Sequence, residues 1–409
     1  MDQANILIIG GGVVGCAIAS EVAAGWPDVF LLEQRPRLGM ATSSRNSGVI
    51  HSGIYYPHNS LKARHCLEGN RLTFDFCEKN GVPHRRTGKL VVATDEHETI
   101  ELEALKKRGE TNGVEGLRMI GAAEIRAREP HVTGVAALDV PSTGIVSSEE
   151  LVRAYGRLAA NRGANIVTHA RVVSLRSEGK SIRAGVRIGD QSDMGSKRAE
   201  LKSRAQQSVG KSDGRADTAG ELSRDEMAVN EDIEARCVIN AAGLYADDVA
   251  AMLGNRSWKI YPVRGEYCEM RGARSSLING LVYPLPHADG LSLGVHFTKT
   301  LWGTVLIGPT ARYVDGKENY ERDRIPIRDF AHGAQRLLPE ISEGDLQLGY
   351  SGLRPKLVPP DEHGPADFVI TRDAKTPSAI HLVGIESPGL TAALSIARQV
   401  CEMAAEILG

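Results

Sequence analysis

The sequence has few cysteines, and no two of them have C-x-x-C spacing: its six cysteines are scattered over 409 residues. This excludes dithiol redox motifs and zinc ribbons, and no cluster of histidines and acids has the spacing of a metal site. Scattered thiols fit a reducing compartment, so the sequence predicts a cytoplasmic protein.

Aromatic residues are also scarce, neither basic nor acidic residues are in large excess, and the sequence has no long hydrophobic run. Aromatics make up 5% of the chain and the formal net charge is −2, so neither base stacking nor electrostatics favours a nucleic-acid partner. The most apolar stretch, residues 6–19, is too short for a transmembrane segment, and no Lys or Arg precedes it as in a signal peptide. We therefore expect a globular protein of two or three domains.

The N-terminus predicts a dinucleotide-binding turn. Residues 6–33 read as a strand, a glycine-rich turn, a helix and a second strand. The turn has the pattern Gly10-x-Gly12-x-x-Gly15, and the second strand ends at Glu33. The glycines allow a pyrophosphate to approach the backbone, the helix N-terminus offers free N–H groups, and Glu33 can accept hydrogen bonds from a ribose. No second turn of this kind follows a strand, which argues against two dinucleotides.

Strand-like runs near both ends of the chain predict one sheet that the two ends build together, with a second, more antiparallel sheet between them. Helices are expected at residues 13–24, 60–80, 96–111, 122–128, 148–162, 327–338 and 391–408. Strands are expected at residues 6–9, 29–32, 89–93, 134–140, 170–175, 182–188, 237–240, 261–270, 281–285, 291–298, 304–308 and 380–383. Residues 190–232 are hydrophilic and contain no aromatic residue, which predicts a surface insertion that the chemistry does not need.

Several segments carry a family resemblance. Residues 46–56 (Asn-Ser-Gly-Val-Ile-His-Ser-Gly-Ile-Tyr-Tyr) and the following 60–63 (Ser-Leu-Lys-Ala) resemble the L-2-hydroxyglutarate dehydrogenase/oxidase family of the D-amino-acid oxidase superfamily. Residues 264–267, 293–298 and 387–391 agree with it. Taken together, the matching segments cover most of the chain outside the hydrophilic insertion.

The resemblance implies FAD as the cofactor and sharpens the expected α/β fold. A Rossmann-like FAD-binding domain would be built from residues 1–88, 141–255 and 346–409. An α+β substrate domain with an antiparallel sheet would take residues 89–140 and 256–345. The residues expected to bind FAD are Gly10, Gly12, Val13, Val14, Gly15, Glu33, Gln34, Arg35, Thr42, Ser43, Ser44, Asn46, Ser47, Val172, Val173, Ala241, Ala242, Gly243, Gly352, Gly389, Leu390 and Thr391.

The implied reaction is oxidation of a small 2-hydroxy acid, with L-2-hydroxyglutarate as the leading candidate. His51 would be the base that takes the hydroxyl proton, and His296 is its rival or a hydrogen-bonding partner of the substrate. Arg354 would grip the substrate carboxylate, because a guanidinium can bind a carboxylate through two parallel hydrogen bonds. A second carboxylate would need the donors Arg264, Tyr267 and Tyr283, which could equally be an ordinary strand charge and core aromatics.

Two other functions remain open at this level. Residues 350–355 (Tyr-Ser-Gly-Leu-Arg-Pro) are similar to the segment of amino-acid-oxidising relatives, which favours oxidation of a C–N bond. A flavin-binding module without turnover could instead use residues 190–232 to dock a partner. An enzyme would pass its electrons to oxygen, a quinone or a carrier protein, and a quinone would place it at the surface of the inner membrane.

Overall fold

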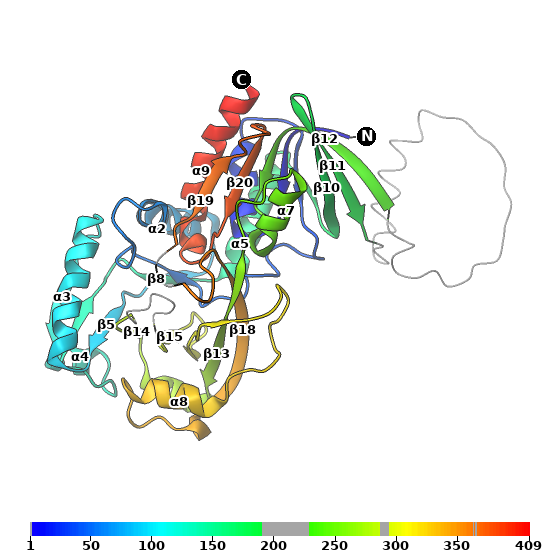
Figure 1. Ribbon diagram of the computed structural model, residues 1–409. Helices are drawn as coiled ribbons and strands as arrows, with labels where there is room; N and C mark the ends of the chain where they lie inside the picture. The colour runs from blue at the N-terminus through cyan, green and yellow to red at the C-terminus, as the bar shows by residue number, and fades with distance from the viewer. Residues whose placement is uncertain (1, 190–228, 287–293, 363, 365) are drawn as a thin grey trace, which may run out of the picture.

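Both ends of the chain contribute strands to one sheet, as the sequence predicts (Figure 1). The computed structural model describes residues 2–189, 229–286, 294–362, 364 and 366–409. Strand β1 (Asp2–Ile9) is central and pairs in parallel with β2 (Val29–Leu32) on one side and with β12 (Val229–Asn240) on the other. From the C-terminal end, β20 (Ala379–Val383) runs parallel to the last residues of β12.

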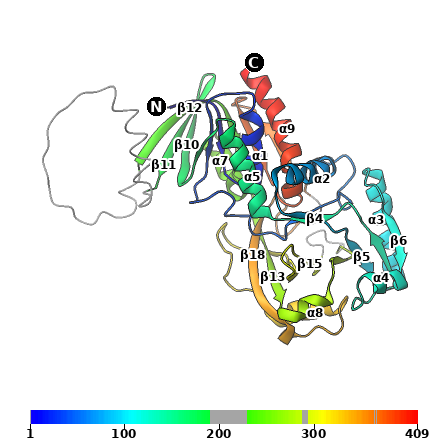
Figure 2. The ribbon, with the colours of Figure 1, turned by 180° about the vertical axis from the view of Figure 1, so that it is seen from behind.

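Four helices cover one face of this first sheet: α1 (Val13–Val22), α2 (Leu61–Asn80), α5 (Ser148–Asn161) and α9 (Gly389–Leu408) (Figure 2). Alternation along β1 explains the layering, because successive side chains of a strand point to opposite faces. Ile6 and Ile8 are buried with these helices, whereas Leu7 and Ile9 belong to the core on the other face. That second core is closed by β10 (Ala170–Glu178), β11 (Ser181–Ile188) and α7 (Ala246–Met252).

The hydrophilic insertion connects β11 and β12, two strands whose ends are adjacent in the sheet. Strands β11 and β12 are antiparallel, and their register pairs Ile188 with Val229. Residues 190–228 lie outside the described residues. The predicted end of the insertion at residue 232 is corrected, because β12 begins at Val229 and Asp232 pairs with Gly185. A short turn could therefore join the two strands.

Replacing residues 190–228 with a short Gly/Ser turn should leave soluble yield, flavin content and turnover within a few-fold of the wild-type values. The paired strand ends already meet, and closing a shorter loop costs less conformational entropy. The measurement is a comparison of the absorbance spectrum and the steady-state rate of the two proteins. Loss of soluble protein on deletion would contradict the prediction and show that the insertion packs against the body.

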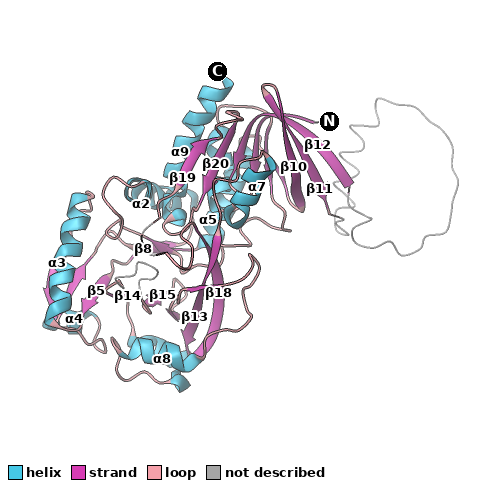
Figure 3. Ribbon diagram, in the orientation of Figure 1, coloured by secondary structure: helices cyan, strands magenta, loops and turns pink. Residues whose placement is uncertain are grey.

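The second sheet is mostly antiparallel and is built from the middle of the chain (Figure 3). Its strands, in spatial order, are β17 (Arg312–Tyr313), β13 (Tyr261–Met270), β16 (Val305–Ile307), β15 (Phe297–Lys299), β14 (Leu281–Pro284), β5 (Leu90–Ala93), β7 (Ala136–Asp139) and β6 (Arg118–Gly121). Helices α4 (Ala122–Arg128) and α8 (Ile327–Gln335) pack on one face, and α3 (Glu96–Thr111) packs on the other. Residues 291–293 of one predicted strand lie outside the described residues.

Small elements that the sequence pattern did not indicate complete the fold. A short sheet joins β3 (Val49–Ile50), β8 (Gly144–Val146) and β4 (His84–Arg86). Strands β9 (Asn165–Val167) and β19 (Val369–Arg372) extend the first sheet, and 3₁₀ turns span Gly243–Tyr245, Gly272–Leu277 and Glu343–Asp345. Within the described ranges, no helix combines the length and apolar character needed to cross a membrane.

Strand β18 (Leu346–Lys356) differs most from the sequence prediction. It pairs along its length with β13 of the second sheet, although the predicted division assigned residues from 346 onward to the FAD-binding domain. The sequence predicts a strand-like run before Arg354 but not its pairing with the second sheet, and Gly349 and Gly352 interrupt the apolar alternation. As a consequence, β18 leads from the second sheet back toward the first (Figure 1). Arg354, near the end of this strand, lines the cavity described below.

Candidate active site

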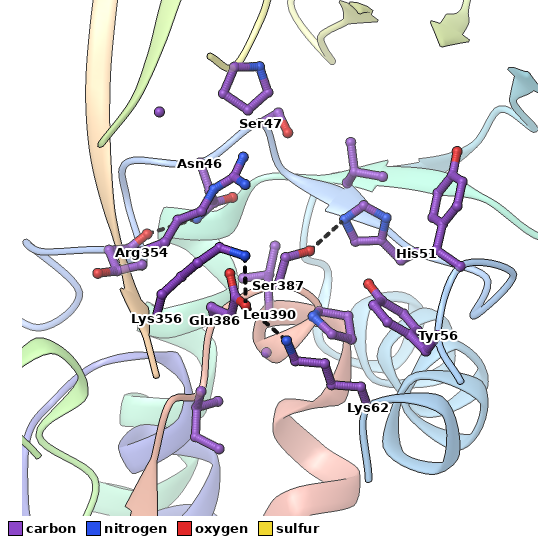
Figure 4. Close-up of a pocket in the computed structure, with 18 of the residues that line it drawn as sticks. Asn46, Ser47, His51, Tyr56, Lys62, Arg354, Lys356, Glu386, Ser387 and Leu390 are labelled. Atoms are coloured by element: carbon purple, nitrogen blue, oxygen red, sulfur yellow. Dashed lines mark hydrogen bonds and ion pairs between the residues drawn. The ribbon is translucent and has the colours of Figure 1, made fainter. Parts of the chain in front are cut away.

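A cavity of about 1030 Å³ is lined by residues of both sheets (Figure 4). This is at the upper end of the ~300–1,000 Å³ range of small-molecule sites, so a cofactor and a small substrate can share it. The sequence-predicted residues that line the cavity are Gly12, Val13, Val14, Thr42, Ser43, Asn46, Ser47, His51, Ala241, Gly243, Tyr267, Tyr283, His296, Gly352, Arg354, Gly389 and Leu390.

Close backbone contacts require glycine at two positions of the N-terminal turn. A Cβ atom at Gly15 would lie 1.9 Å from the carbonyl oxygen of Gly10, and Gly10 itself has a φ of 110° and packs against Ala241. Gly12 is different: an added Cβ would meet only the Ser43 hydroxyl at 3.1 Å, and the residue lines the cavity as the N-cap of α1. The turn therefore leaves space at Gly12 for a ligand to approach the helix N-terminus, as a pyrophosphate requires.

The Glu33 side chain lies against this turn and hydrogen-bonds to its backbone. Its carboxylate accepts hydrogen bonds from the backbone N–H groups of Gly11 and Arg35, both at 2.8 Å. Burial favours the neutral acid and raises the pKa of Glu33, although these hydrogen bonds oppose the shift. Its predicted contact with a ribose stays a prediction.

Other residues predicted to bind FAD lie outside the cavity lining: Gly10, Gly15, Glu33, Gln34, Arg35, Ser44, Val172, Val173, Ala242 and Thr391. Val172 is buried in the core of the first sheet, and Val173 is exposed at a bulge of β10. The beginning of β10 nevertheless lies beside Glu33, because Ala170 donates a backbone hydrogen bond to the Glu33 carbonyl. Contacts of these residues with the cofactor stay predictions.

The Ser/Gly-rich segment after the second strand folds into a tight loop against β18. The Asn46 amide donates to the carbonyls of Thr42 and Ser43, and its oxygen accepts from the N–H of Gly48. A Cβ at Gly352 of β18 would lie 2.0 Å from the Arg45 carbonyl, so only glycine allows this approach. The loop thus fixes one wall of the cavity.

The N-terminus of α9 forms the opposite wall. Gly389 and Leu390 line the cavity, and the buried Thr391 hydroxyl accepts from the backbone N–H of His51 at 3.0 Å. Two helices, α1 and α9, therefore direct their N-termini at the cavity, where the helix dipole favours negative charge or electron-rich atoms. Together with the space at Gly12, this donor set fits FAD: the N-terminus of α1 would hold its pyrophosphate, and the N-terminus of α9 would offer donors to an electron-rich part of the cofactor.

His51 follows the loop and lines the cavity. Its Nε2 lies 3.3 Å from the Ser387 hydroxyl, and its Nδ1 is buried without a hydrogen-bond partner among the described residues (Figure 4). Burial, with smaller contributions from the charges of Lys89, His296 and Arg354, lowers the pKa of His51 to about 3. The imidazole is therefore neutral near pH 7, the state in which a general base must be before it acts, although burial also makes it a weaker base than a free imidazole.

His296 is a second neutral imidazole in the same cavity. Its Nδ1 donates to the Gly294 carbonyl at 2.9 Å, which leaves the lone pair on Nε2. Burial lowers its pKa to about 3 as well, and its ring stacks on Tyr283 with centroids 3.7 Å apart. The structure thus brings together both predicted histidines.

Arg354 lies among these groups. Its charge influences His51, His296, Tyr267 and Tyr283, which all line the cavity. Among the described residues, its guanidinium has no hydrogen bond and no ion pair within 4 Å. A cation that has no partner among the described residues and lines the same cavity as two neutral imidazoles is suited to bind an anionic ligand.

The expectation that Arg264 binds substrate is corrected by the structure. Arg264 is fully buried outside the cavity lining, and its donors go to Glu266 and to the carbonyls of Arg322 and Asp323. Glu266 is also fully buried and accepts from Arg324. Arg264 therefore holds the segment after β17 onto β13 and has no donor to offer a substrate.

Arg264→Met should lower the free energy of unfolding by about 3–5 kcal/mol, because it leaves the buried Glu266 carboxylate short of a partner. The KM for substrate should change little. Urea unfolding and steady-state kinetics measure the two quantities, with Arg271→Met on the exposed surface as the control. A raised KM with unchanged stability would restore the substrate-binding role.

Sequence reasoning missed a charged cluster at the same cavity. Lys62 and Lys356 share Glu386, whose carboxylate lies 2.9 Å from the Lys62 Nζ and 3.6 Å from the Lys356 Nζ (Figure 4). Burial favours the neutral acid, but Lys62, Lys356 and Arg354 outweigh it and lower the pKa of Glu386. One signal was available: Lys356 follows Arg354 by two positions and so lies on the same face of β18. In the part of the chain that the structure describes, no group of three or more potential ligands could hold a metal ion.

Comparison with known proteins agrees with this geometry. The model of the FAD dependent oxidoreductase family (DAO) matches residues 5–403. The mitochondrial L-2-hydroxyglutarate dehydrogenase of Arabidopsis thaliana is 33% identical over 414 residues, which cover 98% of this chain and 83% of that protein. The L-2-hydroxyglutarate dehydrogenase of Escherichia coli K12 is 30% identical, covering 97% of this chain and 92% of that protein.

Solved structures share the fold over nearly the whole chain. The dithionite-reduced L-α-glycerophosphate oxidase of Mycoplasma pneumoniae, with FAD bound, superimposes with a TM-score of 0.79 at 26% identity and covers 100% of this chain and 95% of its own. Glycine oxidase of Geobacillus kaustophilus gives a TM-score of 0.75 at 19% identity, covering 99% and 95% of the two chains. The family match, the full-length relatives and the cradle between α1 and α9 lead to one assignment: this chain belongs to the family of FAD-dependent oxidoreductases.

Proposed function

We propose that the protein oxidises L-2-hydroxyglutarate to 2-oxoglutarate. The observation that carries this proposal is the Arg354 guanidinium, which faces the cavity without a protein partner among the described residues. A 2-hydroxy acid supplies the carboxylate that such a group needs. The full-length similarity to proteins named L-2-hydroxyglutarate dehydrogenase supports this acid among the candidates.

In the proposed reaction, Arg354 binds the C1 carboxylate and so orients C2 and its hydroxyl. The C2–H and O–H bonds break and a C=O bond forms. FAD, when bound, supplies the acceptor for the two electrons and the hydrogen that leave C2. His51 takes the hydroxyl proton, since its lowered pKa keeps the imidazole neutral before the substrate binds. Tyr267 and Tyr283 limit the cavity beside Arg354 and exclude water.

The electrons then pass to oxygen, a quinone or a carrier protein. We propose that this happens in the cytoplasm, or at the inner membrane surface if a quinone is the acceptor. All six cysteines are free thiols, which fits a reducing compartment. Reoxidation of the substrate-reduced protein by air, by a soluble quinone or by neither would identify the class of acceptor.

An anaerobic titration tests the proposed reaction. L-2-hydroxyglutarate and L-glutamate differ only in the group on C2, a hydroxyl in one and an amine in the other. Bleaching of the flavin absorbance by L-2-hydroxyglutarate is the expected result. Bleaching by L-glutamate or another amino acid would instead favour the C–N oxidation that residues 352–355 (Gly-Leu-Arg-Pro) suggest. Bleaching by none of a panel of acids would favour a flavin-binding module without turnover.

A further inference from the structure

Lys89 carries a buried amino group that the proposed reaction does not use. It lies immediately before β5, its side chain is only 1% exposed, and no carboxylate of the described residues forms an ion pair with it. Its Nζ donates to the Tyr55 hydroxyl at 3.1 Å and lies over the rings of Tyr55 and Tyr283, at 4.3 and 4.8 Å from their centroids. Two cation–π contacts and one neutral acceptor compensate burial of an ammonium only in part.

Both tyrosines connect Lys89 to the cavity. Tyr55 and Tyr283 line it, Tyr55 follows His51 by four residues, and Tyr283 stacks on His296. Lys89 itself does not line the cavity; it contacts the cavity-lining residues Tyr55 and Tyr283. Its charge also acts on both imidazoles and contributes to their lowered pKa values.

The hydrogen bond from Lys89 fixes what the Tyr55 hydroxyl can do. Burial lowers the pKa of Lys89 to about 7, and an anion bound nearby would favour its charged form. As an ammonium Lys89 can only donate, so the Tyr55 oxygen is then the acceptor and its own proton points elsewhere. Burial raises the pKa of Tyr55, so the group stays a neutral phenol and keeps that proton. A hydroxyl whose oxygen accepts from a cation is a stronger donor, and here it belongs to a cavity-lining residue. Such a donor favours an anion.

Most other cations that line the cavity pair with protein carboxylates, Arg336 with Glu98 and Arg45 with Glu321. Arg108 also lines the cavity but is exposed on α3. Lys62 and Lys356 share the Glu386 carboxylate, and Arg354 is assigned to the carboxylate next to the reacting carbon. Lys89 has no carboxylate of its own in the described part of the chain. An anion that accepts a hydrogen bond from the Tyr55 hydroxyl would place a negative charge near the Lys89 ammonium, with the hydroxyl between the two.

We propose that Lys89 is a positioning residue that acts through Tyr55 to form the subsite for the second carboxylate of a dicarboxylate substrate. The inference rests on the proposed function, because it assigns the C1 carboxylate of that substrate to Arg354. It makes Lys89 and Tyr55 the pair that distinguishes a dicarboxylate from a monocarboxylate of the same length.

A binding experiment tests the subsite without turnover. Glutarate and pentanoate have five carbons each, and pentanoate carries a methyl group where glutarate has its second carboxylate. Titration of the FAD-loaded protein with each acid, followed by the perturbation of the flavin absorbance, gives the two Kd values. We expect glutarate to bind at least ~10-fold more weakly to Lys89→Met and to Tyr55→Phe than to the wild type, with pentanoate changed by less than ~3-fold.

The variants are chosen to separate this role from a structural one. Tyr55→Phe removes one oxygen and keeps the ring, so it carries the test if Lys89→Met fails to fold. Lys299→Met is the control, because Lys299 lies on β15, donates to the Ser275 carbonyl and does not line the cavity. In the double variant, the two losses of glutarate affinity should not add, since both residues act on one carboxylate.

Reduction of the flavin by substrate gives a second readout. The apparent Kd for L-2-hydroxyglutarate should rise in both variants, while the limiting rate changes by less than ~3-fold. If wild-type flavin is not reduced by this acid, the proposed function fails, and the glutarate titration still tests the subsite. Equal losses for glutarate and pentanoate, or an unchanged glutarate Kd in Tyr55→Phe, would overturn the subsite.

Discussion

His51→Ala should slow flavin reduction by L-2-hydroxyglutarate about 10²- to 10⁴-fold, the range that a positioned general base contributes. Removing the imidazole leaves the hydroxyl proton without its acceptor, whereas the backbone N–H of residue 51 still bonds to Thr391 and holds the loop. Anaerobic stopped-flow measurement of the limiting reduction rate detects the loss. His65→Ala is the matched control, because His65 is buried outside the cavity and bonds to Ser395 on α9.

We expect different kinetic effects from the substitution of the two histidines. His296→Ala should weaken substrate binding more than it slows reduction, because its Nδ1 is committed to Gly294 and its ring supports Tyr283. The reverse pattern, a slow reduction in His296→Ala with a normal rate in His51→Ala, would exchange the two roles. Because burial lowers both pKa values to about 3, kcat/KM should not fall with an acidic limb near pH 6.5.

Local patterns account for the parts of the fold that the sequence predicts well. The glycine turn needs Gly10 and Gly15 for contacts within a few residues, so its pattern is visible without the rest of the chain. Helix α5 begins where a serine hydroxyl can cap it: Ser147 accepts from the backbone N–H of Glu150, three residues on. Helices α3 and α4 likewise have their predicted ends.

What the sequence does not predict depends on contacts between distant segments. Strand β18 has weak alternation, and it forms because β13 supplies its hydrogen bonds and Gly352 fits against Arg45. Arg264 has the residue type of a carboxylate ligand, yet its role is decided by Glu266 and by carbonyls more than 50 residues away. Lys89 precedes a buried strand without any motif, and only the fold shows which two tyrosines surround it.

The second large effect concerns the binding of the substrate carboxylate by Arg354. Arg354→Met keeps the aliphatic stem but removes all five donors, and it should reduce kcat/KM by about 2–5 kcal/mol, or roughly 30- to 5,000-fold. Most of the loss should appear as a raised KM, because the C1 carboxylate needs its charge partner in the ground state as well as in the transition state. Flavin content should not change, since the elements proposed to hold FAD are the glycine turn and the two helix N-termini, not Arg354.

Two variants separate charge from geometry. Arg354→Lys should recover only part of the loss, because one ammonium cannot make the paired hydrogen bonds of a guanidinium. Arg336→Met is the control: Arg336 also lines the cavity, but its guanidinium pairs with Glu98 and is not free for the substrate. Steady-state kinetics with L-2-hydroxyglutarate measures both effects. An unaltered KM in Arg354→Met would remove Arg354 from the substrate site. A carboxylate substrate would then lose its main physical support, because most other cations of the lining already pair with Glu386, Glu98 or Glu321 and Arg108 is exposed.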